Sequence, residues 1–204
     1  MNATGTLEFQ PKDYKRFKQT ENHISPISHP GMLGGTYLAS GIEHVESGAP
    51  TNSGSVHARM NDKRIKKFEP LKSRKDLFEI TGNPDAPLAL VAWGSVAGVC
   101  REALQMAQAE GLNVKLMVPY LLYPVAEATY NRFFASVQKG LVVEQSHLAQ
   151  TFKVLRMHLE LPKGLKSLAR SGANPFLPGE IVEALHHLLA ELQRSHEGKL
   201  QPQE

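Results

Sequence analysis

Two carboxylates and an imidazole stand close together at residues 43–46, inside a stretch rich in glycine and proline. These side chains are Glu43, His44 and Glu46. On an extended loop, such groups can orient a substrate or a mobile partner through charge and hydrogen bonding. Their spacing leaves a second interpretation open, in which the same residues form a solvated polar turn.

A second candidate site follows the apolar run LALVAW, residues 88–93, which predicts a buried strand. The next residues, GSVAG, open a helix whose free N–H groups could bind an anion near Gly94 and Ser95. The alternative is an ordinary turn in which Ser95 caps the helix. Neither the full G-x-G-x-x-G spacing nor a P-loop is present, so a stand-alone nucleotide-binding function would rest on this helix terminus alone.

A third candidate, Glu144 with Gln145, follows the apolar run at residues 141–143. General acid–base chemistry would require Glu144 to be desolvated beside a substrate. The alternatives are that its carboxylate satisfies the N-terminus of the next helix, or that the pair meets a neighbouring domain as an interface.

Metal and thiol chemistry is not expected of this chain. The nine histidines show no helical ligand pair with a nearby carboxylate, so we predict no metal site. The single cysteine, Cys100, excludes a disulfide framework and is too few for an iron–sulfur cluster, which takes about four thiolates. Because Cys100 lies among apolar neighbours in a predicted helix, we expect an inert core thiol.

Composition narrows the class of protein. The chain has 204 residues, of which 41% are hydrophobic and 21% charged, enough for one packed domain with an irregular extension. A net charge of +3 is too small to indicate nucleic-acid binding without a motif. No apolar run is long enough to span a bilayer and the first residues lack a signal-peptide pattern, so we predict a soluble cytoplasmic protein.

The elements that must position these residues fall into two parts. Residues 1–75 form an irregular arm, because the prolines and glycines of residues 23–55 prevent helix and central strand. So long a loop usually packs on a partner or carries function. Residues 55–68 predict a basic amphipathic helix with Met60, Ile65 and Phe68 on one stripe. Arg59 and Lys63 lie on its polar face, which suits docking on an acidic partner better than contacts with phosphates.

Residues 76–194 alternate strand and helix patterns, which predicts an α/β fold: a three-layer Rossmann-like domain with a mostly parallel sheet. Residues 195–204 are expected to form a polar tail. The predicted strands cover residues 88–93, 114–118, 141–144 and 165–168, and the predicted helices cover residues 96–110, 124–137, 147–158 and 178–194.

The run HISPISHPGMLGGTYLASGIEHVESG, residues 23–48, resembles the α subunit of 2-oxoacid:ferredoxin (acceptor) oxidoreductases, especially the 2-oxoglutarate branch. The likeness extends over about residues 13–188. It continues through HARMNDKR at 57–64, LVAWGS at 90–95, LVVEQS at 141–146 and GANPFLP at 172–178.

The resemblance implies a transketolase-C-terminal-like domain that is one part of a longer α subunit. Thiamine diphosphate, Mg²⁺ and the iron–sulfur cluster are then expected in a partner β subunit, with no cofactor bound by this chain alone. The partners would be that β subunit, the remaining α-subunit domains and ferredoxin. The complex would convert a 2-oxoacid and CoA to an acyl-CoA, and this chain alone would be inactive.

The resemblance also implies that Glu43, His44 and Glu46 lie at the edge of a composite active site, together with Ser25 and His29. Many relatives carry Arg and Asp where this chain has Ile27 and Val45, which leaves the identity of the 2-oxoacid open. A different class of function also stays open: a non-catalytic assembly module, or a remnant of that subunit without activity.

Overall fold

Strands β2 (Leu88–Ala92) and β3 (Val114–Pro119) lie in the middle of the C-terminal part of the chain, and every residue in them is buried. Strands buried on both faces read as continuous apolar runs. A computed structural model describes residues 14–200, and their side chains as far as residue 194. The described chain forms two units, an N-terminal unit up to Pro70 and a C-terminal unit from Leu71.

The C-terminal unit is a five-stranded sheet in the order β1-β3-β2-β4-β5. Strands β2, β3, β4 (Lys139–Glu144) and β5 (Gly164–Ala169) are parallel, and β1 (Phe78–Gly82) is antiparallel to β3. In register, Leu90 pairs with Leu116 on one side and with Leu141 on the other. The predicted α/β fold with a mostly parallel sheet is therefore confirmed.

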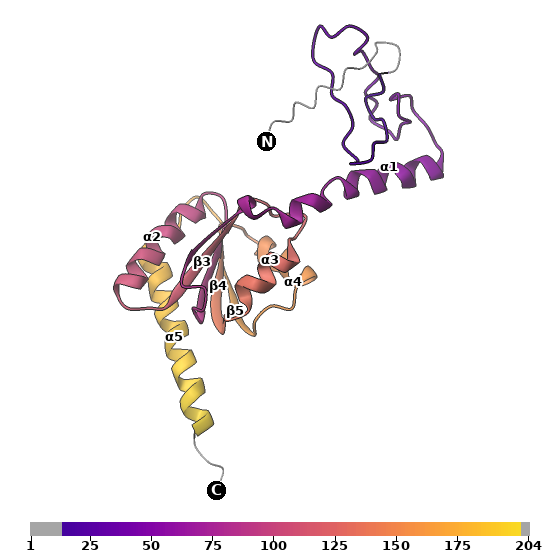
Figure 1. Ribbon diagram of the computed structural model, residues 1–204. Helices are drawn as coiled ribbons and strands as arrows, with labels where there is room; N and C mark the ends of the chain where they lie inside the picture. Colours follow the sequence, from indigo (N-terminus) through magenta and orange to yellow (C-terminus); the bar gives the residue numbers. More distant parts are fainter. Residues whose placement is uncertain (1–13, 201–204) are drawn as a thin grey trace. The chain divides into compact units, whose positions relative to one another are not determined.

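Helices cover both faces of this sheet, as Figure 1 shows. Helices α2 (Val96–Ala109) and α5 (Pro178–Leu200) lie on one face, and α3 (Glu127–Phe134) and α4 (Gln150–His158) on the other. Three layers result, and side chains that alternate along each strand enter two separate cores.

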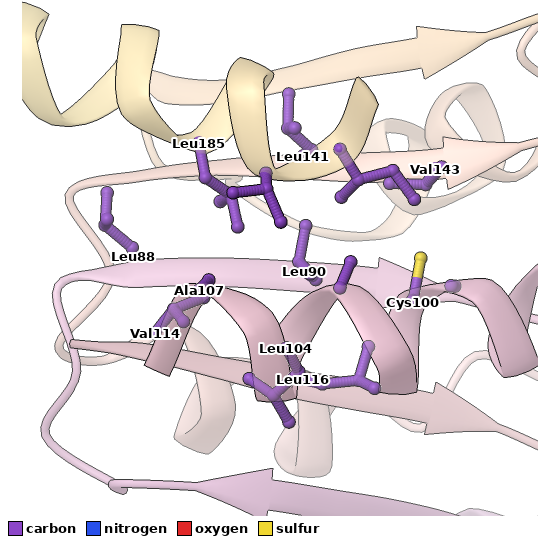
Figure 2. Packing of buried hydrophobic residues seen from close by; sticks show 14 of the residues in the cluster. Leu88, Leu90, Cys100, Leu104, Ala107, Val114, Leu116, Leu141, Val143 and Leu185 are labelled. Atoms are coloured by element: carbon purple, nitrogen blue, oxygen red, sulfur yellow. The ribbon is translucent and has the colours of Figure 1, made fainter. Parts of the chain in front are cut away.

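The core under α2 and α5 contains Leu88 and Leu90 of β2 together with Cys100 and Leu185 (Figure 2). The other core contains Ala89 and Val91 from the opposite side of the same strand. Burial raises the pKa of the Cys100 thiol to about 12, which agrees with the predicted inert core cysteine. The two cores hold β2 and β4 in place, and the loops that follow these strands carry two of the predicted sites.

Helix α2 ends as its sequence indicates. Gly111 has φ +86°, and the Leu112 N–H donates to the Ala107 carbonyl oxygen at 3.0 Å. This hydrogen bond, from the residue after a left-handed glycine back into the last turn, is the usual helix C-terminal motif. It also directs the chain into β3, so the turn and the buried strand were both predictable from local residue types.

Several predicted boundaries were wrong. Helix α3 starts at Glu127 rather than at 124, because Val125 and Ala126 are buried as core residues before the helix begins. Helix α4 starts at Gln150 rather than at 147, where the Glu144 side chain meets its first N–H groups. Strand β1 was not predicted at all, and α5 continues to Leu200 through residues expected to be a tail. Residues 1–13 of the expected arm and 201–204 of the expected tail lie outside the described residues.

The N-terminal unit has one helix, α1 (Gly54–Lys66), among the residues described, with Ser53 as its N-cap. The rest of this unit, from Tyr14 to Ser53, is irregular chain with a single isolated bridge, His44 to Pro50. The basic helix and the irregular arm thus occur where the sequence placed them. Two short 3-10 helices, η1 (Glu69–Ser73) and η2 (Lys75–Leu77), lead to β1.

Candidate functional site

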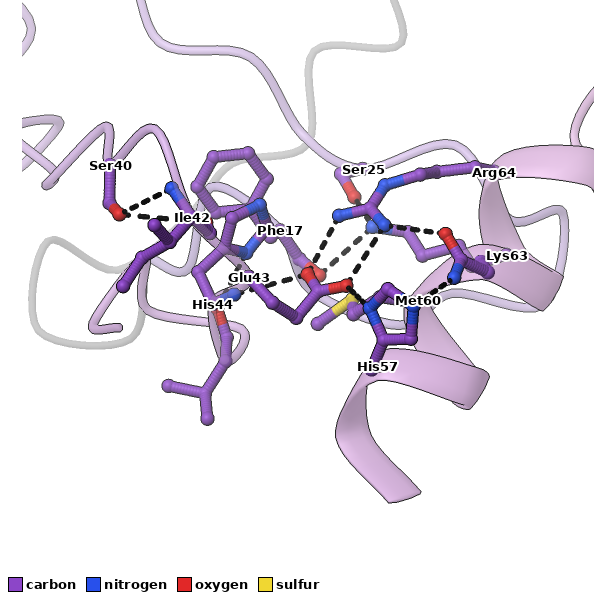
Figure 3. Close-up of polar contacts among 12 residues, drawn as sticks. Phe17, Ser25, Ser40, Ile42, Glu43, His44, His57, Met60, Lys63 and Arg64 are labelled. Atoms are coloured by element: carbon purple, nitrogen blue, oxygen red, sulfur yellow. Dashed lines mark hydrogen bonds and ion pairs between the residues drawn. The ribbon is translucent and has the colours of Figure 1, made fainter. Parts of the chain in front are cut away.

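The carboxylate of Glu43 is the centre of the polar contacts in the N-terminal unit (Figure 3). Arg64 binds it with two hydrogen bonds, Nη2 to Oε1 at 2.8 Å and Nη1 to Oε2 at 3.1 Å. The His44 backbone N–H donates to Oε1 at 3.1 Å, and His57 Nδ1 lies 2.8 Å from Oε2. Charge-assisted, bidentate contacts of this kind are the stronger hydrogen bonds in proteins.

These contacts decide the chemistry of Glu43. The Arg64 guanidinium, followed by the His44 amide and the His57 ring, lowers the pKa of Glu43 to about 2. A carboxylate with so low a pKa is a poor proton acceptor near neutral pH. Glu43 therefore positions the loop and helix α1 and does not serve as a general base.

The hydrogen bonds around His57 also indicate which of its two ring nitrogens carries the proton. The Asn61 side-chain amide donates to His57 Nε2 at 2.9 Å, and the Asn61 oxygen accepts from Arg64 Nη1 at 2.9 Å. Since Nε2 accepts, Nδ1 carries the proton that is donated to Glu43. His57, Asn61 and Arg64 lie at i, i+4 and i+7, one face of α1, so their clustering could have been found from helix periodicity.

The imidazole of His44 lies against the ring of Phe17, with centroids 3.8 Å apart and planes tilted by 31°. Its Nδ1 is 3.2 Å from the Val45 carbonyl oxygen. His44 and Ser25 both line an open pocket of about 270 Å³ in the N-terminal unit. The structure thus brings two of the five predicted substrate-edge residues to one cavity.

The other predicted residues of this loop lie elsewhere. The Glu46 carboxylate accepts a hydrogen bond from the Gln19 backbone N–H at 2.7 Å and lies 3.6 Å from the Lys15 ammonium. It therefore connects residues 15–19 to the loop. His29 is exposed, with Nδ1 3.1 Å from the Pro30 carbonyl oxygen, and is not part of the pocket wall.

A tight turn shapes the loop after Glu46. The Gly48 N–H donates to the Val45 carbonyl oxygen at 2.9 Å, and Gly48 has φ +97°. A Cβ at this position would collide with the Leu38 carbonyl oxygen. Only glycine therefore allows the two segments of the loop to approach so closely.

Helix α1 buries a different face from the predicted one. Met60 is buried as expected, but the side chains of Ile65 and Phe68 are 55% and 37% exposed. Lys63 is buried instead, because its ammonium donates to the Phe17 carbonyl oxygen at 2.9 Å and to the Ser25 hydroxyl. This ammonium is turned inward, whereas Arg59 is exposed on the helix. The interface role predicted for both residues stays a prediction.

In the C-terminal unit, Gly94 and Ser95 form an exposed turn at the start of α2. Gly94 has φ +59°, and its carbonyl oxygen accepts from Ala97 at 3.2 Å. Ser95 makes no side-chain capping hydrogen bond, because its own backbone is already helical. The expected serine cap was therefore wrong, and the turn is made by the glycine.

Glu144 is completely buried and caps helix α4. Its Oε2 accepts the Thr151 N–H at 2.9 Å and its Oε1 accepts the Phe152 N–H at 3.0 Å. This is the helix-capping alternative, and the buried side chain does not reach the surface of the described chain. The neighbouring Gln145 is partly exposed and donates to the Gly172 carbonyl oxygen at 2.6 Å.

Among the side chains that the structure describes, no group of three or more His, Cys, Asp or Glu residues could hold a metal ion. Within the same part of the chain, no helix is both long and apolar enough to cross a membrane.

The class of protein that this chain resembles is the α subunit of 2-oxoacid:ferredoxin oxidoreductases. No family model matches the chain. It is 30% identical over 186 residues to subunit alpha of 2-oxoacid:ferredoxin oxidoreductase 2 from Aeropyrum pernix, covering 90% of this chain and 28% of that protein. It is 29% identical over 178 residues to subunit alpha of 2-oxoacid:ferredoxin oxidoreductase 1 from Sulfurisphaera tokodaii, covering 84% and 27%.

A solved structure agrees in fold. The 2-oxoglutarate:ferredoxin oxidoreductase from Magnetococcus marinus, with 2-oxoglutarate, coenzyme A and succinyl-CoA bound, matches with a TM-score of 0.74 and 35% identity. The match covers 92% of this chain and 32% of that chain. This chain thus spans less than a third of the length of each of these three proteins.

Proposed function

We propose that this chain is the α-subunit portion of a 2-oxoacid:ferredoxin oxidoreductase, with 2-oxoglutarate as the 2-oxoacid. The observation that carries the proposal is the similarity to such subunits over about nine-tenths of the chain, in both sequence and fold. It includes the loop around Glu43 and the Rossmann-like unit alike. The complex, in the cytoplasm, would convert the 2-oxoacid and CoA to an acyl-CoA and CO₂ while it reduces ferredoxin.

The role of the chain would be to supply one edge of a composite active site. Ser25 and His44 would approach the substrate from the pocket wall, since both line it. Glu43 would hold the loop in shape through its contacts with Arg64 and His57. Exposed Ile27 in the same wall, where many relatives of this kind carry arginine, would adjust which 2-oxoacid is accepted.

The redox and thiamine chemistry would belong to a partner β subunit. The residues of this chain do not fit an iron–sulfur cluster, because the single thiol, Cys100, is enclosed in the core. Thiamine diphosphate, held by residues of that partner, would supply the chemistry of the decarboxylation. The chain alone would therefore be inactive, and the remaining α-subunit domains would be needed for assembly.

The test is reconstitution. The chain is co-expressed with the β subunit and the remaining α-subunit domains, and 2-oxoglutarate- and CoA-dependent dye reduction is measured on the purified complex. We expect activity that requires the chain, and a loss of roughly tenfold in kcat/KM in His44→Ala. The matched control is His187→Ala, whose histidine is exposed on helix α5. Failure of the chain to copurify with the β subunit would overturn the proposal.

A non-catalytic assembly role is the second candidate, and one observation favours it. Large apolar side chains of the irregular arm are exposed, as a surface covered by a partner would be. The same experiment separates the two, because an assembly module predicts a complete complex whose turnover is unchanged in His44→Ala. These exposed side chains are Ile24, Ile27, Leu33, Leu38 and Ile42.

A further inference from the structure

Strand β1 and helix α3 border a groove of about 380 Å³, and all of its lining residues belong to the C-terminal unit. This α3–β1 groove has no role in the proposed function. Residues two apart on a strand point to the same face of the sheet. On the face next to α3, Phe78 is buried, with its ring centroid 5.8 Å from that of Tyr130, whereas Ile80 is 51% exposed. Because α3 is only eight residues long, it covers the first side chain and leaves the second uncovered.

The wall of the α3–β1 groove is largely apolar. Phe78 and Ile80 of β1 and Phe133 of α3 contribute to it. Apolar surface in a concave site favours binding when the apolar part of a ligand takes the place of water. The volume also lies within the roughly 300–1,000 Å³ of small-molecule sites. The groove therefore fits a small ligand with an apolar body better than a fully hydrated ion.

The charged residues of this wall are all cations, and none of the described residues that line it is acidic. They are Lys75, Lys115 and Arg132. The side chains of Lys75 and Arg132 are exposed, and the part of the chain that the structure describes gives neither of them a carboxylate within ion-pair distance. The open charge of the groove is therefore positive. Acidic side chains close by in the sequence are held by other cations: Asp76 by Arg74, Glu79 by Arg101 and Glu127 by Lys72.

Lys115 differs from the other two cations because it is enclosed. Its ammonium donates to the Pro84 carbonyl oxygen at 2.6 Å and to the Ser136 hydroxyl at 2.8 Å, and it lies 4.8 Å from the centroid of the Phe133 ring. These hydrogen bonds use two of its three N–H donors. Burial lowers the pKa of Lys115, against an opposing effect of the Asp85 charge. An anion in the groove would stabilise the charged form of this ammonium.

We propose that the α3–β1 groove binds a small amphipathic anion, an apolar body that carries one carboxylate or phosphate group. The apolar body would lie against Ile80 and Phe133, and the anionic group would pair with the cations of the wall, of which Lys75 and Arg132 are exposed. Carboxylate and phosphate share the chemistry that these cations recognise, because both accept charge-assisted hydrogen bonds from Arg and Lys. This inference goes beyond the proposed function and does not rest on it.

The experiment is calorimetric titration of the full chain with octanoate and with octyl phosphate. Two further probes each lack one half of the ligand: octan-1-ol has no charge, and butyrate has a short apolar body. We expect at least one of the two amphipathic anions to bind roughly tenfold more tightly than either of these probes, since each buried methylene tightens binding by about fourfold. The tighter of octanoate and octyl phosphate identifies the preferred anionic group.

Exposed side chains supply variants that are expected to fold. Arg132→Met and Lys75→Met each remove a cation of the wall, and we expect the amphipathic anion to bind about fivefold more weakly, which corresponds to about 1 kcal/mol. Lys153→Met removes an exposed cation of helix α4 that does not line the groove, and affinity should stay unchanged. Ile80→Asp places a negative charge in the groove and should abolish binding, whereas Met157→Asp places the same charge at an exposed position on α4 and should not.

Three results would overturn the proposal. The first is binding of octan-1-ol or butyrate as tight as that of both amphipathic anions, because it would remove the role of the cations or of the apolar wall. The second is equal affinity in Arg132→Met, Lys75→Met and Lys153→Met, which stays decisive if Ile80→Asp unfolds. The third is tighter binding of N-acetyl-leucyl-leucine than of either amphipathic anion, because it would assign the groove to the chain end of a protein partner instead of a small molecule.

Discussion

Removing the Glu144 carboxylate should destabilise the C-terminal unit by about 3 kcal/mol. In Glu144→Ala the N–H groups of Thr151 and Phe152 lose their acceptors in a fully buried place. Each unsatisfied buried donor costs about 1–3 kcal/mol, and partial relaxation of helix α4 recovers some of the total. The expected loss is a large share of the roughly 5–15 kcal/mol that stabilises a domain, and it corresponds to a fall in Tm of roughly 10 °C.

The assay is urea unfolding followed by tryptophan fluorescence. The single tryptophan, Trp93, belongs to the C-terminal unit, so its signal reports on that unit alone. We expect a lower midpoint at unchanged slope for Glu144→Ala, and about half the effect for Glu144→Gln, which keeps one acceptor oxygen. Glu160→Ala, at an exposed position after the same helix, is the control and should leave the midpoint unchanged.

One result would refute this reasoning. If Glu144→Ala unfolds at the same urea concentration as Glu160→Ala, the carboxylate does not cap helix α4 in solution. If, in addition, the reconstituted complex containing Glu144→Ala loses turnover, the acid–base interpretation of Glu144 would replace the structural one.

Three further predictions concern other parts of the chain. The pKa of Glu43 is lowered from 4.5 to about 2, so the stabilisation that its carboxylate provides is complete above pH 4.5 and is lost as pH falls toward 2. In Arg64→Met, the midpoint of an NMR titration of the Glu43 carboxyl carbon should move up toward 4.5. An unchanged midpoint would contradict the pairing. Gly48→Ala should destabilise the loop by about 1–3 kcal/mol and speed its amide exchange, whereas Gly41→Ala, with open space around it, should not. Burial raises the pKa of Cys100 to about 12, so we expect a thiol reagent to label it only after unfolding, and fast labelling of the native chain would disprove its enclosure.

The central strands were predictable because each is a short apolar run buried on both faces. Strands β2, β3 and β4 lie within a residue or two of the predicted ranges. The edge strand β1 escaped prediction because only Phe78 in it is buried and Ile80 is half exposed. Its extended form depends on antiparallel pairing with β3, a partner that the local pattern does not indicate.

In the candidate site, the types of residue were predictable and their partners were not. The cluster of Glu43 and His44 could be found from chemistry and spacing alone. The role of Glu43 as an ionised anchor depends on Arg64, which lies 21 positions further along the chain. Similarly, Lys63 was predicted on the polar face of α1 and is buried, because the Phe17 carbonyl oxygen, 46 positions earlier, accepts its ammonium.

The amino-acid sequence was sufficient for the alternation of strands and helices, the irregular arm, the basic helix and the resemblance on which the proposed function rests. These features depend on periodicity, glycine and proline, and order of motifs, which act over a few neighbouring residues. The tertiary structure decided which charges are paired, which face of α1 is buried, and that Glu144 caps a helix. Such properties depend on segments far apart in the chain that meet only when it folds, and this is why no local pattern contains them.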